Sequence, residues 1–238
     1  MSNNHIVPFF IDDQVRDTFL IIPGGGYEWT SPREGKPVAE ALHRHLWHAA
    51  VFEYRHKHLV FPKLLDEAKE LVDRFRQDSR IRRLFLIGFS AGGHLALMLL
   101  ENNPERYNGG ILVYPVVSSD HQIAHMSSIR NLLGDDRSPD RLEAVALEHH
   151  VPDNCPPVFL CHAMDDMAVD VENTIRLIQA MKSKHIPVEA HLFPAGSHGF
   201  SLGDETTPTL DSDPEEYALK HRHVAQWFPL MVAWIKSL

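Results

Sequence analysis

Short apolar runs alternate along this chain with longer segments whose apolar residues recur at helical spacing. A short apolar run bounded by turn-forming residues is typical of a strand that is buried on both faces of a sheet. Six runs of this kind are predicted as strands: residues 18–22, 49–54, 84–88, 110–114, 158–162 and 188–193.

Five segments have the residue spacing of amphipathic or buried helices. They are residues 32–46, 64–75, 91–100, 171–184 and 214–237. In the first of these segments, Val38, Leu42 and Leu46 fall on one helical face, which predicts that this face packs against the sheet.

The last helix carries a stripe of large apolar residues, which predicts packing in the core rather than a binding surface. The stripe comprises Trp227, Met231, Trp234 and Leu238. Pro229 lies within the same segment and is expected to kink or split the helix, because proline has no amide hydrogen to donate.

The alternation of strands and helices predicts an α/β protein with a mostly parallel sheet covered by helices on both faces. Residues 118–156 interrupt this rhythm with serine, aspartate and histidine among short helical pieces, and are predicted to cross the carboxyl edge of the sheet. The chain shows no repeat, linker or low-complexity tract. Residues 1–238 are therefore predicted to form a single domain, which is long enough to bury a full core.

The composition is that of a soluble globular protein, with 44% hydrophobic and 23% charged residues. The formal net charge is −9, and no basic run is present that could concentrate phosphate groups. Nucleic-acid and anionic-membrane partners are therefore not expected. A homodimer is the assembly to expect if the chain associates with itself, because dimers are the commonest oligomers.

The N-terminal apolar segment at residues 6–11 is too short for a secretory signal, contains Pro8 and is followed by two aspartates. No apolar run approaches the roughly 20 residues that a membrane-spanning helix needs. Cys155 and Cys161 are too few for a disulfide framework, and Cys161 is predicted to be a free thiol in a buried strand. These features predict a cytoplasmic protein.

The segment Gly88-Phe89-Ser90-Ala91-Gly92 follows a predicted strand and opens a predicted helix. A G-x-S-x-G sequence in this setting is the nucleophile elbow of α/β-hydrolases. The turn brings the two flanking glycines so close to neighbouring backbone that a Cβ would not fit at either position. The alternative is a glycine-rich strand–helix turn without chemistry. We predict instead that Ser90 is a nucleophile.

A serine hydroxyl needs a base to remove its proton and an acid to orient that base. In this fold the acid and then the histidine follow the serine, each in a loop after a strand. His198 lies in the glycine-flanked loop after the strand at 188–193, and is predicted to be the base. The acidic turn after the strand at 158–162 supplies the acid.

Two residues of that turn compete for the role of the acid. Asp165 is able to cap the following helix or to remain solvated. Asp166 lies four residues after His162 and three before Val169, a spacing that matches the H-G-x-x-D-x-x-V turn of hydrolases. We favour Asp166 as the acid.

Acyl transfer also needs donors for the oxyanion, and the loss of one donor typically costs roughly 2.7–4 kcal/mol. The amide of Ala91 follows the nucleophile and is a predicted donor. Gly25 and Gly26 follow the first predicted strand, where bare backbone amides can approach a substrate oxygen. A phosphate loop would have Lys-Ser or Lys-Thr after the glycines, whereas Tyr27-Glu28-Trp29 stands here.

Taken together, these residues resemble the α/β-hydrolase esterases related to hormone-sensitive lipase, especially acetyl esterases and acetylxylan-esterase-like proteins. The resemblance extends from about residue 21 to 202. Its motifs are residues 22–27, 88–94, 131–134, 156–162, 171–173 and 193–199. The resemblance implies a triad of Ser90, Asp166 and His198, with oxyanion donors at Gly25, Gly26 and Ala91.

The chain departs from the pattern of these esterases at several positions. Pro23 stands in place of the histidine of H-G-G-G, Asp170 in place of a common proline, and Cys161 in place of a common tryptophan. The departures put the acyl or leaving-group preference in doubt but leave the triad intact. The N-terminal part is short for the superfamily, so the first strands of the sheet are expected to be missing and the cap to be small or absent.

The resulting hypothesis is a serine carboxylesterase that hydrolyses short-acyl esters, acetyl esters above all, of small and sugar-like alcohols, without metal or cofactor. Tyr27 and Trp29 are candidates to line the substrate pocket, with packing as the equal alternative. Other hydrolase activities on this scaffold are a peptidase, a formamidase or a xylan deacetylase, the last disfavoured by the absence of a secretory signal. A non-catalytic binding module is disfavoured because no triad residue is missing.

Overall fold

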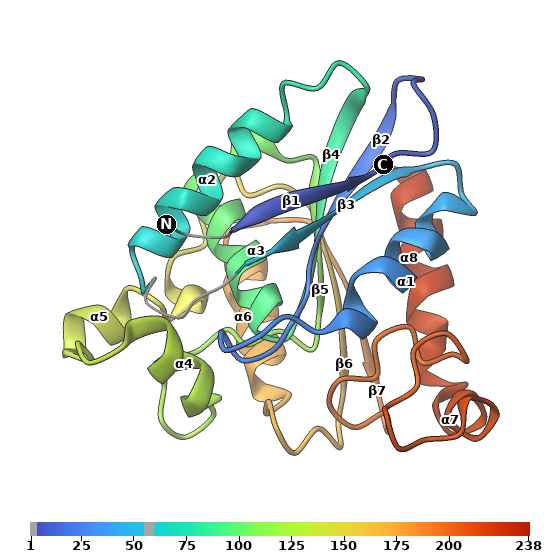
Figure 1. The fold of residues 1–238 in the computed structure, drawn as a ribbon. Helices are drawn as coiled ribbons and strands as arrows, with labels where there is room; N and C mark the ends of the chain where they lie inside the picture. The colour runs from blue at the N-terminus through green and yellow to red at the C-terminus, as the bar shows by residue number, and fades with distance from the viewer. Residues whose placement is uncertain (1–3, 55–59) are drawn as a thin grey trace.

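Seven strands form one sheet in the computed structural model of the chain, which describes residues 4–54 and 60–238, and their order is β1-β3-β2-β4-β5-β6-β7. Strands β2 to β7 are parallel, and β1 pairs antiparallel with β3 (Figure 1). The bounds are β1 His5–Phe9, β2 Arg16–Ile22, β3 His48–Glu53, β4 Ile81–Phe89, β5 Gly109–Val113, β6 Val158–Ala163 and β7 Val188–Phe193.

All six predicted strands are present. Strand β1 was not predicted. Its residues alternate only between intermediate burial and exposure, so its apolar pattern is weak, and it forms by pairing with β3, for example Ile6 opposite Phe52. One strand therefore precedes β2, at the edge of the sheet.

The α-helices lie on both faces of the sheet and at its carboxyl edge. Their bounds are α1 Lys36–His43, α2 Lys63–Phe75, α3 Ala91–Asn102, α4 Met126–Leu133, α5 Pro139–Glu143, α6 Glu172–Ser183, α7 Pro214–His221 and α8 Trp227–Ser237. Short 3-10 helices are η1 Pro32–Glu34, η2 Pro104–Arg106, η3 Leu147–His149 and η4 Val224–Gln226.

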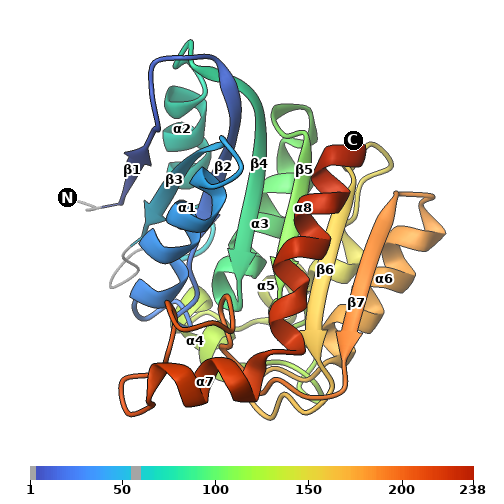
Figure 2. The ribbon, with the colours of Figure 1, turned by 90° about the vertical axis from the view of Figure 1, so that its right-hand side faces the viewer.

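Two hydrophobic clusters, one on each face of the sheet, make up the core. Alternate residues of β2 belong to different clusters: Leu20 lies in the cluster that includes residues of α2, α3 and α6, whereas Phe19 lies in the cluster that includes residues of α1 and α8. Figure 2 shows α1 and α8 in front of the sheet and α6 behind it. The predicted α/β architecture is therefore confirmed, and the carboxyl ends of the parallel strands are left to carry loops.

The predicted helix at 32–46 is wrong in extent. Gly35 has φ −106° and ψ −105°, which breaks the segment into η1 and α1. Val38 and Leu42 are buried as expected, but Leu46 is 61% exposed and has a φ of 60° in the turn that leads into β3.

The C-terminal segment is split as predicted, but not at Pro229. The break falls between α7 and α8, and Pro229 lies in the first turn of α8, where an amide would have no intrahelical acceptor. Trp227, Met231 and Trp234 are buried in the core, whereas Leu238 is 48% exposed at the chain end. Both cysteines are free and buried.

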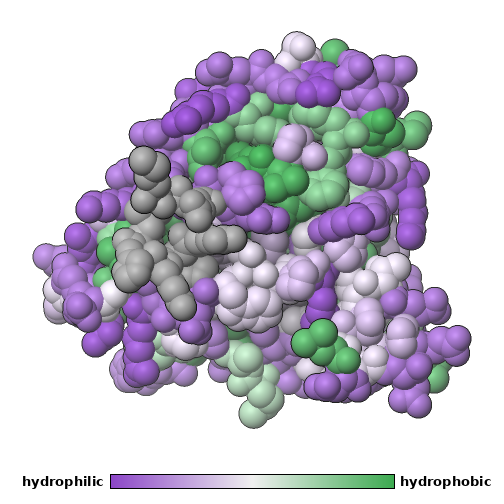
Figure 3. Space-filling model, viewed as in Figure 1, coloured by the Kyte–Doolittle hydropathy of each residue, from purple (hydrophilic) through white to green (hydrophobic). Residues whose placement is uncertain are grey.

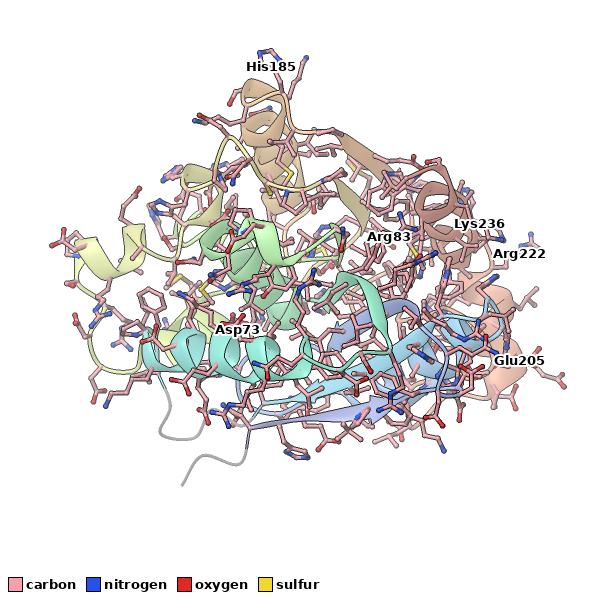
Figure 4. All side chains as sticks on the ribbon, turned by 90° about the horizontal axis from the view of Figure 1, so that it is seen from above. Asp73, Arg83, His185, Glu205, Arg222 and Lys236 are labelled. Carbon is pink, nitrogen blue, oxygen red and sulfur yellow. The ribbon has the colours of Figure 1, made fainter. Side chains whose placement is uncertain are left out.

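In Figure 3 polar side chains surround an apolar area over β1 to β3, and Figure 4 places His185, Glu205 and Arg222 at the periphery, where all three are exposed. Within the described residues, no helix combines the length and apolar character that crossing a bilayer would require.

Candidate active site

Ser90 lies in the tight turn between β4 and α3 with φ 51° and ψ −120°, a strained conformation for a residue with a side chain. A Cβ added at Gly88 would lie 2.6 Å from the carbonyl oxygen of Gly92, and one at Gly92 would lie 2.1 Å from that of Ile22. Both glycines are therefore required for the turn, as the sequence predicted.

The structure brings Ser90, His198 and Asp166 together from three loops at the carboxyl edge of the sheet. His198 Nε2 lies 3.0 Å from Ser90 Oγ, and His198 Nδ1 lies 2.7 Å from Asp166 Oδ2. A carboxylate only accepts, so Nδ1 carries the proton and donates to Asp166. Nε2 is then free to accept from the Ser90 hydroxyl, which is the tautomer that general-base catalysis requires.

Asp166 is fully hydrogen-bonded inside the protein. Its Oδ1 accepts from the amides of Ala168 and Val169, both at 2.9 Å, and its Oδ2 also accepts from His162 Nε2 at 3.2 Å. Burial by itself raises the pKa of Asp166, but the hydrogen bonds from His162 and His198 outweigh it and hold that pKa well below its usual range. The carboxylate is therefore ionised at neutral pH.

His162 orients this carboxylate from the buried side. Its Nε2 faces two acceptors, Asp166 Oδ2 and the Val169 carbonyl at 3.1 Å, so that nitrogen carries the proton. Its Nδ1 lies 2.7 Å from the Thr174 hydroxyl. The sequence analysis used His162 only to count the spacing of the turn and did not predict this contact.

Asp165 makes different contacts from Asp166. Its Oδ1 accepts from the amides of Gly196 at 2.9 Å and Ser197 at 2.8 Å, directly before His198. Ser197 has a φ of 59°, a conformation that such hydrogen bonds stabilise. Asp165 therefore anchors the loop that carries the histidine and does not contact the imidazole itself.

Replacing Asp165 by alanine is expected to lower kcat/KM for p-nitrophenyl acetate about 10-fold, because the loop loses both anchoring hydrogen bonds and small misplacements of a catalytic group are costly. D165N should stay within about threefold of the wild type, since the asparagine oxygen still accepts from both amides. Steady-state rates of the two variants measure this. Wild-type activity in D165A would show that the loop holds its shape without Asp165.

The loop after β2 lies beside the serine. Gly25 and Gly26 have φ angles of 130° and 65°, and a Cβ at Gly25 would lie 2.0 Å from the carbonyl oxygen of Trp29. Among the hydrogen bonds between described residues, none has the Gly25 or Gly26 amide as its donor. The Ala91 amide is the first of α3, where an amide has no intrahelical acceptor. All three predicted donors are thus available to a ligand.

A cavity of about 350 Å³ opens over these groups. Its lining includes Ser90, His198 and the glycine loop, together with His125 and Ser127 from the segment around α4. Asn131 of α4 also lines the cavity, and its side-chain amide donates to the Gly26 carbonyl at 2.8 Å. The excursion at 118–156 therefore forms one wall of the cavity, as its predicted position over the sheet edge allows.

Tyr27 and Trp29, the two aromatic candidates for the pocket, lie in different surroundings. Trp29 lines the cavity and is 56% exposed. Tyr27 is 1% exposed and does not line it; the Tyr27 hydroxyl lies 2.8 Å from Nδ1 of the buried His94. His94 Nε2 donates to the Val145 carbonyl, so Nδ1 accepts from Tyr27. Tyr27 is therefore a packing residue, because its hydroxyl forms its hydrogen bond in the core.

Known proteins share the sequence and the fold that carry this site. Residues 44–226 match the sequence profile of the prolyl oligopeptidase family, and this range includes Ser90, Asp166 and His198. The chain belongs to the prolyl oligopeptidase family. Its sheet and covering helices are those of the α/β-hydrolase fold, as in solved structures that align over nearly the whole chain.

Two relatives of this chain have names that refer to xylan. The chain is 32% identical to endo-1,4-beta-xylanase B of Butyrivibrio fibrisolvens in an alignment of length 216 that covers 82% of this chain and 34% of that protein. It is 29% identical to an acetylxylan esterase of Xylanibacter ruminicola in an alignment of length 194 that covers 76% of this chain and 40% of that protein. The chain thus spans well under half of these two relatives.

One solved structure aligns over a larger share of both chains than these two relatives do. The acetyl ester-xyloside bifunctional hydrolase of Caldicellulosiruptor lactoaceticus is 30% identical with a TM-score of 0.80, and the alignment covers 96% of this chain and 88% of that one. The predicted resemblance to α/β-hydrolase esterases of the acetylxylan-esterase type is confirmed by these names, and the profile match gives the family to which the chain belongs.

Proposed function

We propose that the protein is a serine carboxylesterase that releases acetyl and other short acyl groups from esters of small, sugar-like alcohols. The observation that carries this proposal is the hydrogen-bonded chain from Ser90 through His198 to Asp166, beside the amides of Gly25 and Gly26, which have no acceptor among the described residues. This arrangement supplies a nucleophile, a base in the correct tautomer and an oxyanion site at one place.

In the first half-reaction His198 Nε2 takes the proton of Ser90 while Oγ attacks the ester carbonyl. The carbonyl oxygen becomes an oxyanion, which accepts hydrogen bonds from the amides of Gly25, Gly26 and Ala91. The bond to the alcohol oxygen then breaks, and His198 gives its proton to the departing alcohol. Ser90 is left as an acyl ester, and the ionised Asp166 stabilises the positive imidazole throughout.

In the second half-reaction water takes the place of the alcohol. His198 accepts a proton from the water, whose oxygen attacks the acyl carbonyl and forms a second oxyanion in the same site. The bond to Ser90 Oγ breaks, Oγ recovers the proton from His198, and the free acid leaves. Apart from this water, the steps described use only groups of the chain and of the substrate.

The cavity supports a small substrate with a polar alcohol. Its volume of about 350 Å³ is at the low end of the range for ligand sites. The ring of Trp29 provides an exposed apolar surface of the kind on which sugars stack, and His125, Ser127 and Asn131 add polar groups to the lining of the same cavity. Relatives named as an acetylxylan esterase and as an acetyl ester-xyloside hydrolase fit the same substrate class.

Acyl-chain length provides the test of the proposed substrate. We expect kcat/KM for p-nitrophenyl acetate to exceed that for the octanoate by about 10-fold or more, because a small pocket excludes the long chain from the oxyanion site. Acetate release from acetylated xylosides, followed by an enzyme-coupled assay, should be saturable. Higher kcat/KM for octanoate than for acetate would contradict the short-acyl proposal.

The family also includes peptidases by name, and an acylamino-acid-releasing enzyme of Mus musculus is 24% identical over 142 residues, half of this chain. An N-acetylated amino acid p-nitroanilide therefore belongs in the same assay. Turnover of this amide above that of p-nitrophenyl acetate would replace the esterase proposal by a peptidase one.

A further inference from the structure

Glu34 is a buried carboxylate at the edge of the cavity that the mechanism above does not use. It ends η1, is 3% exposed and lines the same cavity as Ser90 and His198. Its Oε2 accepts from the Gly24 amide at 2.7 Å, and its Oε1 accepts from the Tyr114 hydroxyl at 2.7 Å. Each oxygen thus receives a donor, which suits an ionised carboxylate.

Gly24 places this carboxylate against the catalytic turn. A Cβ at Gly24 would lie 2.9 Å from Ser90 Cβ and 3.0 Å from Glu34 Oε2, so no side chain fits between the glycine loop and the serine. Gly24 directly precedes the proposed oxyanion donors at Gly25 and Gly26. A hydrogen bond that fixes its amide therefore fixes the loop on which those donors lie.

Tyr114 extends the contact to the histidine loop, which we define as residues 194–202. The Tyr114 hydroxyl donates to Glu34 and accepts from the Ser201 amide at 3.0 Å. Its ring packs edge-on against the imidazole of His198, with centroids 5.0 Å apart. The Ser201 hydroxyl also donates to the Arg33 carbonyl at 2.8 Å. Glu34 thus connects the oxyanion loop with the loop that carries the base.

Among the residues that the structure describes, none forms a direct ion pair with Glu34. The Arg33 guanidinium donates instead to the carbonyls of Gly199 and Thr207 and to the Tyr217 hydroxyl. Burial raises the pKa of Glu34, and the hydrogen bonds from Tyr114 and Gly24, together with the nearby His198 and Arg33, offset only part of that rise.

The titratable groups that face Glu34 come from several elements. They are Arg33 of η1, Tyr54 after β3, Tyr114 after β5, His198 of the histidine loop and Tyr217 of α7. His198 itself is faced by Asp166, Glu34 and His125. Glu34 and Asp166 are therefore two carboxylates that lie near the imidazole.

We propose that Glu34 is a positioning residue for the esterase reaction: its carboxylate holds the oxyanion loop at Gly24 and, through Tyr114, the histidine loop. This inference rests on the proposed function. Because the interior is a poor dielectric, the same negative charge also stabilises the imidazolium that forms when His198 takes the proton of Ser90.

The test is E34Q, with Y114F as a second variant and E40Q as a matched control. Glutamine keeps the size of Glu34, but its amide nitrogen would face a donor, Gly24 N–H or Tyr114 O–H. Y114F keeps the Gly24 contact but removes the hydroxyl, and with it both the hydrogen bond to Glu34 and the one from Ser201. Glu40 lies exposed on α1, paired with Lys36, so E40Q removes a carboxylate from outside the site.

Three measurements are made on each variant: kcat and KM with p-nitrophenyl acetate, the pH dependence of kcat/KM, and the fraction of serines labelled by a fluorophosphonate. In E34Q we expect kcat to fall about 10- to 100-fold with KM changed less than about threefold, as for a misplaced catalytic group. The acid limb of the profile should move to lower pH, because losing the charge makes protonation of His198 less favourable. Y114F should show a smaller loss of kcat.

The outcomes separate this inference from the proposed function. Near-complete labelling of E34Q together with low kcat would support positioning over loss of the fold. If E34Q does not fold, Y114F provides the test instead. A wild-type kcat in Y114F would overturn the proposal. Rates and pH profiles of E34Q equal to those of E40Q would also overturn it, as would a rise in kcat, which would mean that the charge opposes the oxyanion. Wild-type activity in S90A would instead refute the esterase function.

Discussion

Replacing Ser90 by alanine is expected to lower kcat/KM for p-nitrophenyl acetate by about 10⁴- to 10⁶-fold, a loss of about 5 to 8 kcal/mol of transition-state stabilisation. The alanine variant has no oxygen to form the acyl-enzyme, and only the oxyanion site and substrate binding remain. The Ser90 hydroxyl lies 3.0 Å from Nε2 of His198, the base that would take its proton, and the alanine variant lacks this hydroxyl.

The control for S90A is its thermal stability. The variant loses one hydrogen bond in a chain of 238 residues, so its unfolding temperature should stay within about 2–4 °C of the wild type. Labelling by a fluorophosphonate should disappear in S90A and remain in the wild type. Residual activity within 10-fold of the wild type would mean that another residue is the nucleophile.

Replacing Asp166 by asparagine is expected to lower kcat by about 10⁴-fold, as for other triads with this change. Asparagine has one acceptor oxygen, whereas Asp166 accepts from His198 and His162 on Oδ2 and from two amides on Oδ1. The amide nitrogen would turn toward His198 and drive the imidazole into the tautomer with its proton on Nε2. That nitrogen could then no longer accept from Ser90.

The neighbouring D165N variant is the matched control, since it makes the same chemical change one residue away and preserves the acceptor for Gly196 and Ser197. It should retain activity within about threefold. Equal losses in D165N and D166N would contradict the assignment of Asp166 as the acid, and a larger loss in D165N would reverse it.

Stability gives a second readout for Asp166. Because its pKa in the folded protein is lowered, the ionised carboxylate stabilises the fold above its unfolded pKa of about 4. That contribution is lost as the pH falls toward the lowered folded value. The difference in unfolding temperature between wild type and D166N should therefore shrink in acid and be largest near neutral pH.

Local sequence was most informative where the chain must satisfy one steric demand. Gly88 and Gly92 are required by backbone atoms 2.6 Å and 2.1 Å from any added Cβ, and a motif records that demand directly. Strands β2 and β4 were predictable because they are buried on both faces and therefore almost continuously apolar. Strand β1 was missed because it lies at an edge and is only partly buried.

Contacts between distant segments left no comparable signal. Tyr27 and Trp29 are two residues apart in one turn, yet the first faces His94 in the core and the second faces the cavity. The local sequence around Glu34, in a short helix, does not indicate a role for it. Its role depends on a hydrogen bond from Tyr114, which lies 80 positions later in the chain. The different contacts of Asp165 and Asp166 likewise depend on where the loop after β7 passes.

The sequence by itself determined the alternation of strands and helices, the turn at Ser90 and the order of serine, acid and histidine along the chain. These features depend on neighbouring residues, whose steric and apolar requirements are met within a few positions. Only the tertiary structure decided which aspartate contacts the imidazole, which aromatic ring lines the cavity and that Glu34 connects two loops. Those choices depend on hydrogen bonds between segments that only the folded sheet brings within about 3 Å of one another.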